Sequence, residues 1–172
     1  MIQITEGNLL QAPAEALVNA VNCVGVMGKG IALQFKQAFP ANFREYVAAC
    51  KAGEVQPGRM LIHDNGRQSL PYWIINFPTK RHWRDKSRLE DVRSGLDALV
   101  EEVRRLGIRS IAVPALGCGL GGLEWNEVRP LIEQAFVALP DVHVLLYAPA
   151  GAYSAGRTAA VADRSRDSST AI

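Results

Sequence analysis

Short apolar runs and longer amphipathic patterns alternate along this chain. The apolar runs predict strands at Met1–Ile4, Ala16–Val21, Arg59–His63, Tyr72–Phe77, Ser110–Pro114 and His143–Tyr147. Apolar residues spaced three or four apart predict helices over Lys29–Phe39, Asn42–Lys51, Leu89–Leu106 and Asn126–Leu139. The turn residues 64–66 predict a hairpin-like pair from the strands on either side. Strands that alternate with helices predict an α/β sandwich.

Two glycine-rich segments each follow a predicted strand and precede a predicted helix. They are Gly25–Gly30 and the stretch 116–123. Glycine lets the backbone approach a phosphate, and a helix N-terminus offers unpaired N–H groups. Either loop alone could be an ordinary connector, but two at the carboxyl edge of one sheet predict a diphosphate site made of backbone amides. Their spacing matches neither the dinucleotide fingerprint nor the P-loop.

Two asparagines precede the first glycine segment. Asn19 and Asn22 are three residues apart, so on a regular strand they point to opposite faces and one of them can meet a ligand. Asn22 ends the strand beside the loop and is the candidate for hydrogen bonds to sugar hydroxyls. Asn19 is expected to satisfy nearby backbone groups.

The chain has 172 residues, 48% of them hydrophobic, which predicts one domain with a sizeable core. A net charge of +2 is too small to indicate nucleic-acid binding, so such contacts need a local patch. Residues 78–86 form a predicted basic loop, in which Arg81, His82, Trp83 and Arg84 combine cations with an indole that suits an unstacked base. The alternative is a solvated loop whose Trp83 packs on its own domain.

Cysteine usage and the ends of the chain give further expectations. The three cysteines, Cys23, Cys50 and Cys118, lack metal-ligand spacing, so we expect reduced thiols, a cytoplasmic protein and no metal. The N-terminus lacks a signal-peptide pattern, and no segment reaches transmembrane length, so no membrane contact is expected. One folded domain over residues 1–149 is expected, followed by a disordered tail or linker stub over 150–172.

Several motifs together resemble the macrodomain, an ADP-ribose-binding module. They are Val18–Asn22, the glycine loop after it, and Pro114–Gly119. Met27–Ala32 resembles the branch that contains the human terminal ADP-ribose glycohydrolase, and Asn76–Arg84 resembles the DarG-type antitoxins, which are bacterial DNA ADP-ribosyl glycohydrolases. The resemblance covers residues 1–149 and implies a three-layer α/β/α fold around a mixed sheet.

The resemblance also implies where ADP-ribose lies. The two glycine loops would close over the diphosphate, with Asn22 at the distal ribose. Asn8 matches an aspartate that takes the adenine amino group in many macrodomains, and an amide accepts that hydrogen bond more weakly. The residues expected to bind ADP-ribose are Asn8, Gly28, Gly30, Ile31, Gly117, Cys118, Gly119, Leu120 and Gly121. Cys118 is expected to be a small residue that fits the turn, not a nucleophile.

Lys80 is the expected catalytic residue, with Asn22 beside it. In this branch a lysine at the matching place acts at the anomeric carbon of the distal ribose. A lysine in a partly desolvated pocket loses affinity for its proton, so a neutral amine becomes available. The human relative pairs its lysine with an aspartate at the position of Gly121, and this chain lacks that carboxylate. Two routes stay open: attack by Lys80 on a substrate with a good leaving group, and water attack beside a cationic Lys80.

The resemblance therefore implies hydrolytic release of ADP-ribose from thymine bases in DNA, opposing a DNA ADP-ribosyltransferase toxin of the DarT type. The implied partners are ADP-ribose, ADP-ribosylated single-stranded DNA and the cognate toxin, and no cofactor is expected. One alternative is hydrolysis of ADP-ribosyl esters of glutamate or aspartate on protein. Another is a non-catalytic ADP-ribose reader, which has no use for Lys80.

Overall fold

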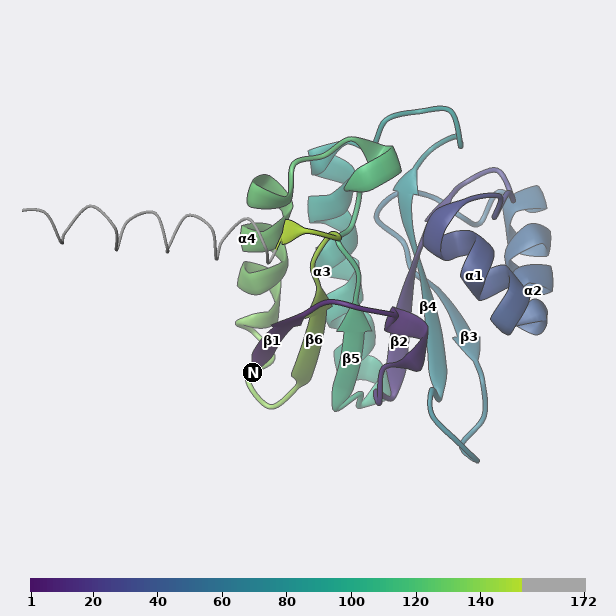
Figure 1. Ribbon diagram of the computed structural model, residues 1–172. Coiled ribbons are helices and arrows are strands. Elements are labelled where there is room, and N and C mark those ends of the chain that lie inside the picture. The colour runs from purple at the N-terminus through teal and green to yellow at the C-terminus, as the bar shows by residue number, and fades with distance from the viewer. Residues whose placement is uncertain (153–172) are drawn as a thin grey trace, which may run out of the picture.

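A six-stranded sheet in the order β1-β6-β5-β2-β4-β3 is the centre of the computed structural model (Figure 1). Neighbouring strands are parallel except β3 and β4, which pair antiparallel as the hairpin prediction required. The structure describes residues 1–152, so nearly all of the predicted tail lies outside the described residues. The strands are β1 (Ile2–Thr5), β2 (Ala16–Asn22), β3 (Leu61–Asp64), β4 (Trp73–Lys80), β5 (Ser110–Val113) and β6 (His143–Tyr147).

Helices cover both faces of this sheet (Figure 1). The α-helices are α1 (Gly30–Ala38), α2 (Pro40–Lys51), α3 (Leu89–Leu106) and α4 (Trp125–Phe136), and the short 3-10 turns are η1 (Leu9–Gln11) and η2 (Gly119–Gly121). Helices α3 and α4 share the largest buried core with one face of the sheet. Helix α1 and η1 pack on the other face, and α2 closes a third cluster at the end of β2. The predicted three-layer α/β/α fold with a mixed sheet is confirmed.

Strand β2 runs through the middle of the sheet and is apolar on both faces. Ala16 and Val18 belong to the core under α3 and α4, whereas Leu17 packs with Phe35 of α1. Side chains alternate along a strand, so a strand covered on both faces needs apolar residues at nearly every position. This burial explains the continuous run that marks β2 in the sequence, and it fixes the direction in which the first glycine loop leaves the sheet.

Helix α3 lies unusually close to β4. An ideal Cβ built on Gly95 would lie 2.4 Å from the ring of Phe77, so only glycine leaves space for that ring. The helix ends at Gly107, whose left-handed φ of 63° is the usual conformation of a glycine C-cap. The predicted bounds of α3 are confirmed. Within residues 1–152, no helix combines the length and the apolar character needed to cross a bilayer.

Several predicted boundaries differ from the structure by one to three residues, and two of these differences involve proline. Strand β4 continues through residues 78–80, which the sequence placed in a loop. Strand β3 pairs only with Trp73–Asn76 of β4, so Pro78 falls where β4 has a pairing strand on one side only and its missing N–H is tolerated. Helix α2 begins at Pro40 instead of Asn42, because proline fits the first helical position. Lys80 is therefore the last residue of a strand.

Candidate functional site

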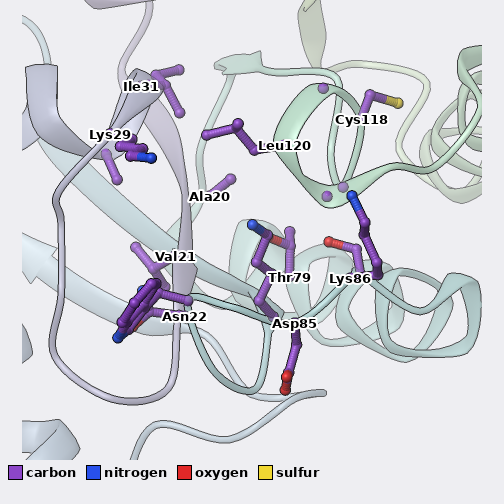
Figure 2. Close-up of a pocket in the computed structure, with 18 of the residues that line it drawn as sticks. Ala20, Val21, Asn22, Lys29, Ile31, Thr79, Asp85, Lys86, Cys118 and Leu120 are labelled. Carbon is purple, nitrogen blue, oxygen red and sulfur yellow. The ribbon is translucent and has the colours of Figure 1, made fainter.

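A pocket of about 810 Å³ lies at the carboxyl ends of β5, β2 and β4, which are neighbours in the sheet (Figure 2). Its walls are the end of β2, the first glycine loop, the end of β4 with the loop that follows it, and the second glycine loop. The size is in the range of small-molecule sites. Three loops that are far apart in the sequence meet here because three adjacent parallel strands end here.

The predicted glycine-loop residues all line this pocket. They are Gly28, Gly30, Ile31, Gly117, Cys118, Gly119, Leu120 and Gly121, and Asn22 and Lys80 line it with them. Asn8 is not among the lining residues. It is exposed and caps η1, where its Oδ1 accepts the N–H of Leu10 at 3.0 Å. A contact between Asn8 and adenine stays a prediction.

Asn22 shapes the first glycine loop. Its Oδ1 accepts the N–H groups of Val24 at 3.1 Å and Val26 at 3.4 Å, and its Nδ2 donates to the Val26 carbonyl at 2.7 Å. The hydroxyl of Tyr46 on α2 lies 2.7 Å from both the carbonyl oxygen and Oδ1 of Asn22, to which it donates. One Nδ2 proton of Asn22 is used in the bond to the Val26 carbonyl, so the second Nδ2 proton is available as a donor. No spacing in the sequence indicates the Tyr46 contact, because the partners are 24 residues apart.

Asn19 is fully buried behind the pocket. Its Nδ2 donates to Oδ1 of Asn76 at 3.3 Å, and Asn76 exchanges hydrogen bonds with Asn42 of α2. Side chains, and not the backbone groups expected from the sequence, therefore hold this amide. As predicted, only one of the two asparagines on β2 reaches the pocket.

The second glycine loop receives the segment that follows Lys80. The N–H of Ser87 donates to the Gly121 carbonyl at 2.9 Å. An ideal Cβ at Gly117 or at Gly121 would lie 3.1 Å from Cβ of Ser87, and at Gly121 also 2.4 Å from its Oγ. Side chains at these two positions would displace Ser87. The loop therefore needs glycine both to leave space for Ser87 and to make its left-handed turns.

Cys118 lies half-buried in this second loop. Burial, with the nearby Glu124 carboxylate adding to it, raises the pKa of the Cys118 thiol to about 11. The thiol is therefore protonated at neutral pH, the less reactive form.

Lys80 ends β4 directly opposite Asn22 in the pairing of β2 with β4. The register shifts just before this pair, because Val21 pairs with Pro78 and Asn22 with Lys80. Partial burial lowers the pKa of the Lys80 ammonium, and the like charges of Lys86 and Lys29 lower it further, while Asp85 opposes them. A lysine that lines a pocket and has a lowered pKa is a candidate catalytic group.

The four predicted nucleic-acid residues occupy different environments. Arg81 forms a two-point ion pair with the buried Asp91 of α3, at 3.3 Å from Nε and 3.2 Å from Nη2. His82 accepts the N–H of Arg84 at its Nδ1. Trp83 and Arg84 line the pocket, and Trp83 is 47% exposed with the Arg84 guanidinium 4.6 Å from its ring centre. About half of the Trp83 surface therefore remains open to solvent.

The pocket is strongly cationic. Lys29, Lys80, Arg84 and Lys86 line it, and Asp85 is the acidic residue beside them. Across residues 1–152, the ion pairs leave these four cations without a carboxylate partner within 4.0 Å. The arrangement suits a polyanionic ligand. In the same part of the chain, no group of three His, Cys, Asp or Glu side chains is placed to hold a metal ion.

The family described as "Macro domain" matches residues 18–132. A DNA ADP-ribosyl glycohydrolase of Thermus aquaticus is 55% identical over 149 residues, which are 87% of this chain and 41% of that protein. This chain therefore spans about two fifths of the length of this curated relative.

Two solved structures share the fold. The macrodomain of Mycobacterium tuberculosis DarG is 53% identical with a TM-score of 0.86, covering 87% of this chain and 99% of that one. Thermosipho africanus DarTG in complex with ADP-ribose is 38% identical with a TM-score of 0.80, covering 87% of this chain and 42% of that one.

Proposed function

Because this chain belongs to the macrodomain family, we propose that it is a hydrolase that removes ADP-ribose from thymine bases in DNA. The observation that carries the proposal is the place of Lys80, which ends β4 in a pocket walled by two glycine loops. Similarity to proteins named DNA ADP-ribosyl glycohydrolase, and to a structure solved with ADP-ribose, supports the ligand and the reaction.

The two glycine loops would hold the diphosphate of ADP-ribose. Backbone N–H groups of such loops bind phosphate oxygens without the bulk of side chains. Ile31 and Leu120 add apolar contacts above the loops, and Asn22 has a free amide proton for a hydroxyl of the distal ribose. Asn8, placed outside the pocket walls, would reach the adenine at the far end of the ligand.

Lys80 would act at the anomeric carbon of that distal ribose. In the first route its neutral amine forms a bond to this carbon while the bond to the thymine nitrogen breaks, and water later releases the sugar from Lys80. In the second route water attacks the carbon, and the ammonium of Lys80 stabilises the negative charge that develops on thymine. In both, the thymine imide leaves with the electron pair of the broken bond and takes up a proton.

The wall opposite Lys80 offers no carboxylate to assist. At Gly121 the space for a side chain is filled by Ser87, so the chain cannot place an aspartate there without moving the basic segment. A reaction without a strong acid needs a leaving group that carries negative charge well, and the imide of thymine delocalises it over two carbonyls. This favours a nucleobase substrate over a copy of the protein-directed reaction.

The loop after Lys80 would contact the DNA. Trp83 presents an exposed indole at the pocket mouth, where a base removed from its stack could lie on it. Arg81, His82 and Arg84 would meet phosphates, and half of the Arg81 side chain stays exposed beside its bond to Asp91. Single-stranded DNA fits this arrangement because its bases are already accessible.

Similarity to proteins named DarG and DarTG supports an antitoxin setting. In a cytoplasmic toxin–antitoxin pair, this domain would repair the DNA modified by a DarT-type ADP-ribosyltransferase, which would be its partner. Residues 1–149 would form the catalytic macrodomain. Two other activities fit the pocket less well: hydrolysis of ADP-ribosyl esters on protein, which leaves the exposed Trp83 unused, and ADP-ribose reading, which leaves Lys80 unused.

A release assay separates these functions. The protein and its Lys80→Ala variant are incubated with ADP-ribosylated single-stranded DNA and with protein carrying ADP-ribosyl-glutamate, and free ADP-ribose is quantified. We expect release from DNA that the variant loses. Release from protein alone would establish the ester activity, and release from neither substrate, with ADP-ribose still bound, would establish a reader.

A further inference from the structure

The segment between β4 and α3 is fixed to the second glycine loop at two successive residues. Ser87 holds the Gly121 carbonyl through its N–H at 2.9 Å and fits between Gly117 and Gly121. Beside it, the stem of Lys86 lies along Gly122, with Cδ 3.1 Å and Nζ 3.6 Å from where a Cβ of that glycine would be. The left-handed φ of 80° at Gly122 suits glycine, and the missing side chain leaves the surface on which Lys86 rests.

This contact determines where the Lys86 amine lies. Figure 2 shows the amine end of Lys86 directed toward the second glycine loop, while the Asp85 carboxylate turns away from it. Lys86 and Lys80 line the same pocket. In the described part of the chain Lys86 forms no ion pair within 4.0 Å, so its charge is not neutralised by a neighbour.

We propose that Lys86 is a positioning residue for the reaction: its ammonium, held on the second glycine loop, shares the pocket with Lys80 and controls the protonation state in which Lys80 meets the substrate. The effect on catalysis rests on the function proposed above. The electrostatic effect on Lys80 does not, because it exists in the protein before any substrate binds.

The charges around Lys80 support this assignment. Lys86 and Asp85 face it from the loop after β4, and Lys29 faces it from the N-terminal end of α1. Arg84 also lines the pocket, and the second glycine loop, residues 117–122, contributes no charged side chain. After burial, the charge of Lys86 is the largest cause that lowers the pKa of Lys80. A second ammonium next to a lysine makes the neutral amine easier to form.

The direction of the effect is the same for both routes of catalysis. If neutral Lys80 attacks the sugar, release rises with pH through the Lys80 pKa; if cationic Lys80 stabilises the leaving group, release falls through it. Removing the charge of Lys86 raises that pKa in either case. The part of the pH–rate profile that reports the Lys80 pKa must then move to higher pH.

The experiment titrates Lys80 directly, by following the NMR signals of its side-chain Cε and Nζ with pH in the protein without substrate. In Lys86→Gln we expect the Lys80 pKa to rise above that of the native protein at low salt, because a like charge is removed. Lys86→Arg keeps the charge and should keep the low pKa, and Lys51→Gln, at the exposed end of α2, should leave it unchanged. The pH–rate profile of ADP-ribose release should shift to higher pH in parallel with the Lys80 titration.

An unchanged Lys80 titration in folded Lys86→Gln would overturn the proposal, and so would an equal rise in Lys51→Gln. A protein that shows the titration shift and releases no ADP-ribose from any substrate would leave the electrostatic role of Lys86 in place and refute the proposed function instead. The two failures are therefore distinguishable.

Discussion

The hydroxyl of Tyr46 lies 2.7 Å from both Oδ1 and the main-chain carbonyl oxygen of Asn22, and so connects helix α2 to the end of β2. Asn22 in turn holds the first glycine loop through its hydrogen bonds to Val24 and Val26. Tyr46 is fully buried and does not touch the pocket. It therefore shapes one wall of the site from behind.

Tyr46→Phe removes this hydroxyl and little else. We expect the free energy of unfolding in urea to fall by about 1 to 2 kcal/mol, because a buried hydrogen bond is lost. We also expect weaker ADP-ribose binding by calorimetry, since the loop is less well ordered before the ligand arrives. Tyr72→Phe, outside the pocket, is the matched control. Equal affinity in the Tyr46 variant and the native protein would show that the loop does not depend on this bond.

Substitution of Lys80 tests the chemistry apart from binding. Lys80→Ala should reduce the rate of ADP-ribose release from DNA by about a hundredfold or more, with the affinity for free ADP-ribose changed less than about threefold. Lys80→Arg then distinguishes the routes, because arginine keeps the charge and cannot act as the nucleophile. Substantial release by Lys80→Arg would support water attack. Full activity of Lys80→Ala would exclude Lys80 from the reaction.

Arg81 and Arg84 should respond differently to the same change. Arg81 is held by the buried Asp91, so Arg81→Gln should lower the thermal midpoint and weaken DNA binding only slightly. Arg84 has no such partner among the described residues. Arg84→Gln should therefore lower the slope of log DNA affinity against log salt concentration by about one, the value of one phosphate contact, at unchanged stability. Binding of single-stranded oligonucleotides over a range of salt concentrations measures this. An equal loss of DNA affinity in both variants would contradict the expected difference between Arg81 and Arg84.

The Cys118 thiol should react slowly, although it lies in the second glycine loop at the pocket. Its raised pKa of about 11 leaves about a hundredfold less thiolate at pH 8 than an ordinary cysteine has. Alkylation by iodoacetamide, followed by peptide mass spectrometry, should be slow at pH 8 and accelerate as the pH rises toward 11. Cys118→Ala should keep ADP-ribose release. Alkylation as fast as that of free glutathione would mean that the thiol is activated in a way that its surroundings do not explain.

The sequence was sufficient for the six strands and for the place of the two glycine loops. Each of these leaves a local pattern: a strand buried on both faces is continuously apolar, and a loop that must approach a phosphate or turn left-handed needs glycine at fixed places. Lys80 was assigned through family resemblance, and its position at a strand end next to these loops agrees with that assignment. The local rule failed at Pro78, where proline is tolerated because β3 is too short to pair there.

The contacts that shape the pocket were not readable from the sequence. Tyr46 of helix α2 contacts Asn22 at the end of strand β2, Arg81 pairs with Asp91 only once α3 is packed, and Ser87 contacts Gly121 across 34 residues. None of these pairs has a spacing that marks it, since each exists only after the chain has folded. The resemblance predicts an adenine contact for Asn8, and the structure shows that its side chain caps η1; short polar side chains can serve both purposes.

A crystal structure of this protein with ADP-ribose tests the central claim most directly. The account predicts the diphosphate between the two glycine loops, at Gly28–Gly30 and Gly117–Gly121, with the distal ribose beside Asn22 and its anomeric carbon within reach of the Lys80 amine. Density for ADP-ribose outside this pocket would contradict the account. So would a bound ligand whose anomeric carbon the Lys80 side chain cannot approach in any rotamer.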